Sequence, residues 1–245
     1  MARANYKRRF AIAPAMIWRL VLGGWLSVTS VTPLLAASTG SIKGRVLLVG
    51  EVTQPRPVEI PDKYIEKCGA KKVVETLAVS PDHGIKNAVV SLLDVKQKVI
   101  RPGKNLTLDQ TACVFTPHVL IVPVGASVEI LNNDGILHNI HAHSSKNPVF
   151  NKAQPGSVKK ITTSFSEPEI IKVTCDVHPW MLGWIVVTDL AQATATNDGG
   201  TFSLTQVPAG IHTLEVWHET LGTTKKKILV EAGKETNITI ELRKR

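Results

Sequence analysis

The chain has 245 residues, of which 43% are hydrophobic, 5% aromatic and 20% charged, with a formal net charge of +9. This length supports one large or two small domains with real cores. The sequence lacks basic clusters interleaved with aromatic residues, which argues against nucleic-acid binding. It also lacks serine-based and paired-carboxylate hydrolase motifs, so we expect no enzyme activity.

The first 37 residues differ from the rest of the chain. Arg3, Lys7, Arg8 and Arg9 precede an apolar stretch that ends in the small residues of "LLAAS". This pattern predicts a secretory signal peptide over residues 1–37 and export to the periplasm or the extracellular space. The alternative is an uncleaved anchor that would associate the chain with a membrane. The segment holds five basic residues and no acid, so its removal lowers the net charge from +9 to a mild +4.

From residue 38 onward, short runs rich in Val, Ile, Leu and Thr alternate with Gly, Pro, Asn and Asp. This pattern predicts an all-β fold built from sandwiches or barrels. Three stretches can be told apart, residues 38–103, 104–190 and 191–245. Near the end of the last stretch, Ile238, Ile240 and Leu242 alternate with polar residues, which predicts a half-buried strand.

The two outer stretches each carry part of one signature. Residues 40–46 read "GSIKGRV" and residues 198–214 read "DGGTFSLTQVPAGIHTL". Together they resemble the carboxypeptidase regulatory-like (transthyretin-like) family. The resemblance implies a second small β-sandwich that is split in sequence by the insertion of residues 104–190. The competing interpretation is two domains in series, with residues 38–103 forming an irregular N-terminal extension.

Three cysteines remain after export, Cys68, Cys113 and Cys175. In an oxidising compartment thiols are usually paired or put to use. Cys175 belongs to a separate motif, which leaves Cys68 and Cys113 as a candidate disulfide. The sequence alone does not fix this connectivity.

That separate motif is "TCDVHPWM", in which Cys175, His178 and Met181 recur every third residue. Period-two alternation in "EIIKVTC" directs the Cys175 side chain to the core, and the motif follows at the tip of a predicted hairpin. A fourth ligand, His138, follows the turn sequence "NNDG" on another loop. Two imidazoles, a thiolate and a thioether favour one copper ion that cycles between Cu(I) and Cu(II). Zinc gains little from a thioether.

Two further histidines lie close to His138. In a strand, His141 and His143 face one side and His138 the other, so the three should not share one site. His141 and His143 are therefore interpreted as solvated residues, with a separate surface metal site as the alternative. His141 is also the alternative to His138 as the fourth ligand, and the pairing of His138 with Asn139 in a His-Asn sequence favours His138.

His-Asn on one loop and Cys-x-x-His-Pro-x-Met on another resemble the type 1 copper pattern of the cupredoxin family, with the loop length of amicyanin. The resemblance covers about residues 105–189 and implies a Greek-key β-sandwich. It implies that His138, Cys175 and His178 are equatorial ligands and that Met181 is a weak axial ligand. It also implies that Asn139 hydrogen-bonds across to the cysteine loop.

The resulting hypothesis is an exported mononuclear type 1 copper protein that acts in electron transfer. His178 is expected on an exposed loop, with a redox partner protein docking near Trp180 and His178. One alternative is a copper delivery or sequestration protein without redox turnover. Another is an interaction module in which the outer sandwich is the working part.

Overall fold

A computed structural model describes residues 39–52, 55–96 and 106–244, so the predicted signal peptide lies outside it. Within these ranges the regular structure is strand, apart from the short helix α1 (Asp62–Cys68). The predicted all-β class is confirmed. In the same ranges, no helix has the length and apolar character needed to cross a membrane.

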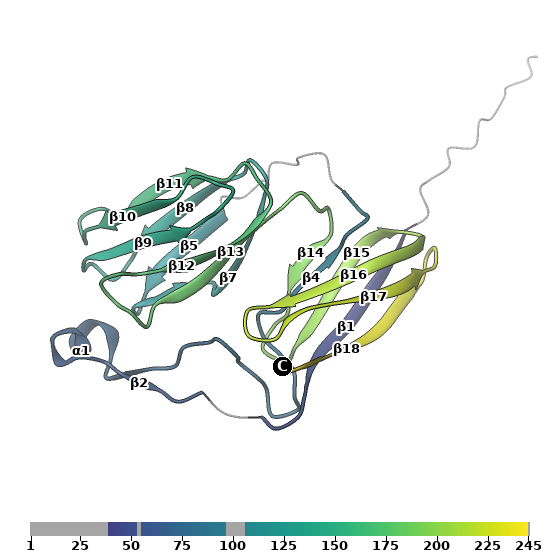
Figure 1. Cartoon of the computed structure of the whole chain (residues 1–245), viewed down its shortest axis with the longest axis horizontal. Coiled ribbons are helices and arrows are strands. Elements are labelled where there is room, and N and C mark those ends of the chain that lie inside the picture. Colours follow the sequence, from purple (N-terminus) through teal and green to yellow (C-terminus); the bar gives the residue numbers. More distant parts are fainter. Residues whose placement is uncertain (1–38, 53–54, 97–105, 245) are drawn as a thin grey trace, which may run out of the picture. The chain divides into compact units, whose positions relative to one another are not determined.

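The middle of the chain forms a β-sandwich, here called the middle sandwich (Figure 1). One sheet has the strand order β10-β9-β12-β13-β7 and the other β11-β8-β5-β6. Strand alternation places Ile171 and Val173 of β12 in the core, each 0% exposed, and leaves Lys172 exposed. The strands are β5 (Leu106–Thr111), β6 (Val114–Thr116), β7 (Val119–Pro123), β8 (Ser127–Asn132), β9 (His138–His143), β10 (Phe150–Gln154), β11 (Lys160–Ser164), β12 (Glu169–Thr174) and β13 (Leu182–Thr188).

Strands from both ends of the chain form a second pair of sheets, here called the terminal sandwich. Its sheets have the orders β15-β1-β18 and β14-β4-β16-β17. Strands β1 and β18, purple and yellow in Figure 1, run parallel side by side. The strands are β1 (Thr39–Val49), β4 (Val89–Leu92), β14 (Ala193–Ala195), β15 (Thr201–Pro208), β16 (Gly210–His218), β17 (Gly222–Val230) and β18 (Glu235–Arg243).

The terminal sandwich has a hydrophobic core of its own. One cluster of buried side chains joins Ile42 and Val90 to Phe202, Leu214 and Ile240. The predicted alternation in β18 is confirmed, because Ile240 and Leu242 are buried and Ile238 is half-buried, whereas the polar residues that alternate with them are exposed. Residues from both ends of the chain therefore share one core, and the middle sandwich lies between them in sequence.

A short segment, residues 60–68, packs against the core of the middle sandwich, and we call it the α1 segment. It contains α1 and is flanked in sequence by β2 (Val58–Glu59) and β3 (Lys71–Lys72), which pair with each other as a two-stranded antiparallel ribbon. Ile60 and Cys68 are buried in the core of the middle sandwich. The Cys68 sulfur is bonded to that of Cys113, with 5.2 Å between the two Cα atoms. Strand patterning alone did not predict this helix.

Candidate metal centre

The hairpin between β12 and β13 carries three of the predicted ligands. The two strands pair antiparallel up to Thr174 and Leu182. Beyond that pair, the Cys175 amide donates to the Met181 carbonyl at 3.3 Å, and the Met181 amide donates to the His178 carbonyl at 2.9 Å. These bonds fold residues 175–181 into a tight loop, so side chains three residues apart can face one point.

The fourth predicted ligand reaches the same end of the sheet from a neighbouring strand. His138 begins β9, which pairs antiparallel with β12. The turn before it is held by Asn132, whose side-chain amide donates to the Ile136 carbonyl at 2.8 Å. Gly135 in this turn has φ +72°, a left-handed conformation that glycine adopts at little cost. The turn therefore fixes where β9 starts and where His138 points.

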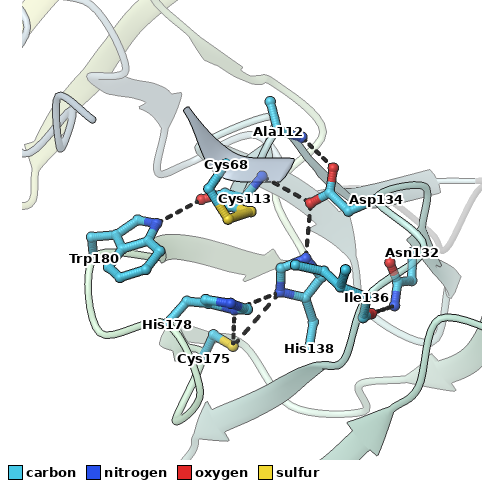
Figure 2. The surroundings of a disulfide bond; sticks show 10 residues. All are labelled: Cys68, Ala112, Cys113, Asn132, Asp134, Ile136, His138, Cys175, His178 and Trp180. Atoms are coloured by element: carbon cyan, nitrogen blue, oxygen red, sulfur yellow. Dashed lines mark hydrogen bonds and ion pairs between the residues drawn. A yellow bond between two sulfur atoms is a disulfide. The ribbon is translucent and has the colours of Figure 1, made fainter. Parts of the chain in front are cut away.

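His138, Cys175 and His178 converge on one buried position (Figure 2). The two histidine Nδ1 atoms are 2.9 Å apart. The Cys175 Sγ atom lies 4.0 Å from Nδ1 of His138 and 3.7 Å from Nδ1 of His178. Cys175 is 2% exposed and both histidines are 0% exposed. One sulfur and two imidazole nitrogens thus face a common centre away from solvent.

The electrostatics of this group favour a thiolate. Burial raises the pKa of the Cys175 thiol, but hydrogen bonds with His138 and His178 outweigh it and lower this pKa to about 6. Burial lowers the pKa of His138, but hydrogen bonds with Asp134 and Cys175 outweigh it and raise this pKa to about 9. A metal cation that replaced the proton in the Cys175–His138 hydrogen bond would therefore meet a sulfur atom that is already anionic.

His138 is oriented by a carboxylate on its far side. Its Nε2 atom lies 2.8 Å from Oδ2 of Asp134, whose side chain is 7% exposed. The same carboxylate accepts the backbone amides of Ala112 at 2.6 Å and Cys113 at 2.8 Å. Both of these residues have positive φ, +50° and +55°, which turns their amides toward Asp134. With Nε2 bonded to the carboxylate, Nδ1 of His138 is left facing the centre.

Asn139 connects the two loops. Its side-chain oxygen accepts the Asp176 amide at 2.6 Å, and its own backbone amide donates to Cys175 Sγ at 3.4 Å. Its side-chain amide donates to the Asn151 oxygen at 2.5 Å. These contacts hold the cysteine loop against the start of β9.

Met181 lies in the same loop and is 1% exposed. Its backbone bonds to Cys175 and His178 keep it beside them. The expectation that His178 is exposed is wrong, because the Tyr64 ring of the α1 segment lies against it with ring centroids 4.5 Å apart. Trp180 is only 8% exposed. Docking of a partner near these residues stays a prediction.

His141 and His143 point away from the centre, as strand parity predicted. Their rings stack on each other, with centroids 4.0 Å apart. His141 Nδ1 lies 3.1 Å from Oδ1 of Asp176, and His143 Nε2 lies 2.7 Å from the Thr174 hydroxyl. They do not join the His138 group.

Sequence reasoning missed two residues at this centre, Asp134 and Tyr64. Asp134 was interpreted as a turn residue only, although an acid four positions before a candidate ligand was a usable signal. Tyr64 gave no signal, because it lies far from the motif in an irregular stretch of sequence.

No protein-family model matches the chain, and no curated protein matches it either. Several solved structures are similar to part of it. A Cu-containing nitrite reductase from Thermus scotoductus SA-01 is 26% identical over 40% of this chain and 25% of its own, with a TM-score of 0.33. A purple cupredoxin from Nitrosopumilus maritimus is 25% identical over 34% of this chain and 100% of its own, with a TM-score of 0.30. A Cu(I) form of an amicyanin variant is 18% identical over 40% of this chain and 98% of its own, with a TM-score of 0.32.

Proposed function

We propose that the middle sandwich is a cupredoxin domain that binds one copper ion and that the protein acts in electron transfer. The observation that carries the proposal is the convergence of Cys175 Sγ and the two histidine Nδ1 atoms in a buried group. His138, Cys175 and His178 would hold the ion, with Met181 as the weak axial ligand. Bound copper would supply a one-electron couple between Cu(I) and Cu(II).

Two features of the chain favour electron transfer over catalysis. All four proposed ligands are at most 2% exposed, which leaves no ligand facing a substrate from solvent. The bonds of Asp134 to His138 and of Asn139 to the cysteine loop restrain the donor atoms from both sides. A restrained ligand set limits rearrangement between the two oxidation states. Such restraint is the feature that a delivery protein, which must release its ion, would lack.

The wider proposal includes export, which rests on the sequence of residues 1–37, and a regulatory-like family assignment for the terminal sandwich. The redox partner is proposed to dock near Trp180 and His178. At that surface it would meet the α1 segment first.

The test is to add one equivalent of Cu(II) to residues 38–245 and record visible and electron paramagnetic resonance spectra. We expect an intense thiolate-to-copper band and a compressed hyperfine splitting. Cys175→Ser and His138→Ala should lose the band. His141→Ala is the matched control on the same strand and should keep it. A pale, ordinary Cu(II) spectrum in the unaltered chain would contradict the proposal.

A further inference from the structure

The two histidines of the candidate metal centre are held in different ways. Metal-binding histidines usually donate the far ring N–H to a carboxylate, a carbonyl or water, which fixes the ring orientation. His138 does so through Asp134. In contrast, Nε2 of His178 is buried and has no hydrogen-bond partner among the described residues. Another interaction must orient the His178 ring.

Aromatic contacts surround the His178 ring. Tyr64 meets it edge to face, with centroids 4.5 Å apart and planes at 70°. Trp180 lies 5.1 Å away at 54°, and Tyr64 and Trp180 also touch edge to face at 5.9 Å. Edge-to-face ring pairs of this kind are favourable beyond their buried area. The His178 ring is therefore fixed by packing between Tyr64 and Trp180.

Tyr64 is itself held in place from two sides. The Lys63 ammonium lies 4.6 Å from the centroid of its ring, a cation–π contact. The helix that carries it is bonded to the middle sandwich through Cys68 and Cys113. The Cys113 carbonyl also accepts the Trp180 Nε1 proton at 3.2 Å (Figure 2). Cys113 therefore helps to hold both rings that flank His178. Its disulfide anchors the helix that carries Tyr64, and its carbonyl accepts the hydrogen bond from Trp180.

We propose that Tyr64 is the positioning residue for His178 and that the α1 segment keeps solvent from this ligand. Tyr64 does by ring contact for His178 what Asp134 does by hydrogen bonding for His138. This inference rests on the proposed function, because it assumes that His178 is a copper ligand. A surface hollow of about 240 Å³ is lined by Tyr64, Lys63 and Leu137 among others, and the Tyr64 ring that lines it also contacts His178. Removing the ring would therefore open His178 to that hollow.

The experiment compares Tyr64→Ala and Tyr64→Phe with the unaltered full chain. The first readout is the rate at which the Cu(I)-loaded protein gives up copper to a Cu(I) chelator. Loss of a group that orients a ligand costs about 10–100-fold in metal affinity or activity, so we expect Tyr64→Ala to release copper about 10–100-fold faster. Tyr64→Phe keeps the ring and should behave as the unaltered chain does. Ile65→Ala, a matched control on the outer side of the same helix, should change nothing.

A second readout needs no copper. Diethyl pyrocarbonate modifies accessible imidazoles, and mass spectrometry of the apoprotein would report His178 and His138 separately. Tyr64→Ala should become modified faster at His178 while His138 stays protected. Should Tyr64→Ala fail to fold, Tyr64→Leu still tests the ring contact through copper release, because leucine fills the space but offers no flat ring to pack against His178, and Tyr64→Ser opens the space for the modification test. Unchanged copper release together with unchanged His178 modification would overturn the inference. Failure of the unaltered chain to give a type 1 spectrum would overturn the proposed function, while the apoprotein readout would still judge the role of Tyr64.

Discussion

Loss of the Cys68–Cys113 disulfide should strongly destabilise the apoprotein. The bond closes a loop with a sequence separation of 45 residues. In the chain-entropy treatment, a loop of this length restricts the unfolded chain by about 13 cal/mol/K, or about 4 kcal/mol at 25 °C. Both cysteines are buried, at 2% and 0% exposure, so alanine substitution also removes packing around the sulfur atoms. We therefore expect Cys68→Ala/Cys113→Ala to lose at least about 4 kcal/mol of unfolding free energy.

The assay is guanidinium unfolding of the apoprotein, followed by tryptophan fluorescence. The unaltered chain measured with and without a thiol reductant serves as the control, because reduction removes the cross-link and leaves both sulfurs in the core. The reduced chain and the double variant should therefore shift in the same direction. A loss of less than about 1 kcal/mol of unfolding free energy in both the reduced chain and the double variant would refute the reasoning. It would mean that the disulfide hardly reduces the conformational entropy of the unfolded chain.

Three other side chains give sharp expectations. Asp134→Ala should lower copper affinity about 10–100-fold and lower the unfolding free energy of the apoprotein by about 3 kcal/mol, because the Cys113 amide and His138 Nε2 lose their acceptor. Asp134→Asn should give values between those of Asp134→Ala and the unaltered chain. Competition with a copper chelator measures the affinity, and chemical unfolding measures the stability. At pH 7, Glu169→Gln should lower the unfolding free energy by about 1–2 kcal/mol, allowing for screening of this partly exposed group by solvent. The Glu169 carboxylate accepts hydrogen bonds from the Ser144 hydroxyl and from backbone amides of the loop that follows Ser144. Burial raises the Glu169 pKa, but these hydrogen bonds outweigh it and hold the pKa well below its usual range, so its contribution is lost as pH falls through the folded-state value and the variant's deficit should shrink in acid. Burial lowers the pKa of His218 to about 4, so between about pH 6.5 and 4 the unfolded state binds more protons than the folded state. Unfolding titrations should therefore show the unfolding free energy falling by about 3 kcal/mol as the pH is lowered from about 6.5 to 4.

Each of these expectations has an outcome that contradicts it. Unchanged copper affinity in Asp134→Ala would show that His138 keeps its orientation without the carboxylate. A Glu169→Gln deficit that stays constant from neutral to strongly acidic pH would show that its charge is irrelevant. A pH profile that His218→Gln leaves as steep as before would assign the acid destabilisation to another group.

The faces of the strands and the convergence of His138, Cys175 and His178 could be predicted from sequence, because strand alternation and short loops determine both. Alternation in β12 sets the buried side regardless of what packs there, so Cys175 follows Ile171 and Val173 into the core. Three of the proposed ligands lie within seven residues of one hairpin loop, and this loop brings the Cys175 sulfur and the His178 ring together. His138 could be placed because an antiparallel neighbour strand begins at the same end of the sheet.

The surroundings of the centre could not be predicted in the same way. The α1 segment contains only a seven-residue helix and lies between two very short strands, which is too brief for a periodic signal. Its contact with His178 depends on tertiary packing and on which two of three cysteines pair, and sequence does not determine that pairing. The exposure expected of His178 was therefore wrong, although its position in the hairpin loop was predicted.

Cys113 connects the supports of both histidines, through different atoms. Its amide donates to Asp134, which orients His138, whereas its sulfur holds the helix that carries Tyr64 against His178. The first link is a backbone contact and survives when the cross-link is cut, but the second does not. Cutting the disulfide should thus loosen His178 while leaving His138 bonded to its carboxylate. The two histidines would then respond separately to reduction, although their Nδ1 atoms lie 2.9 Å apart at the same centre.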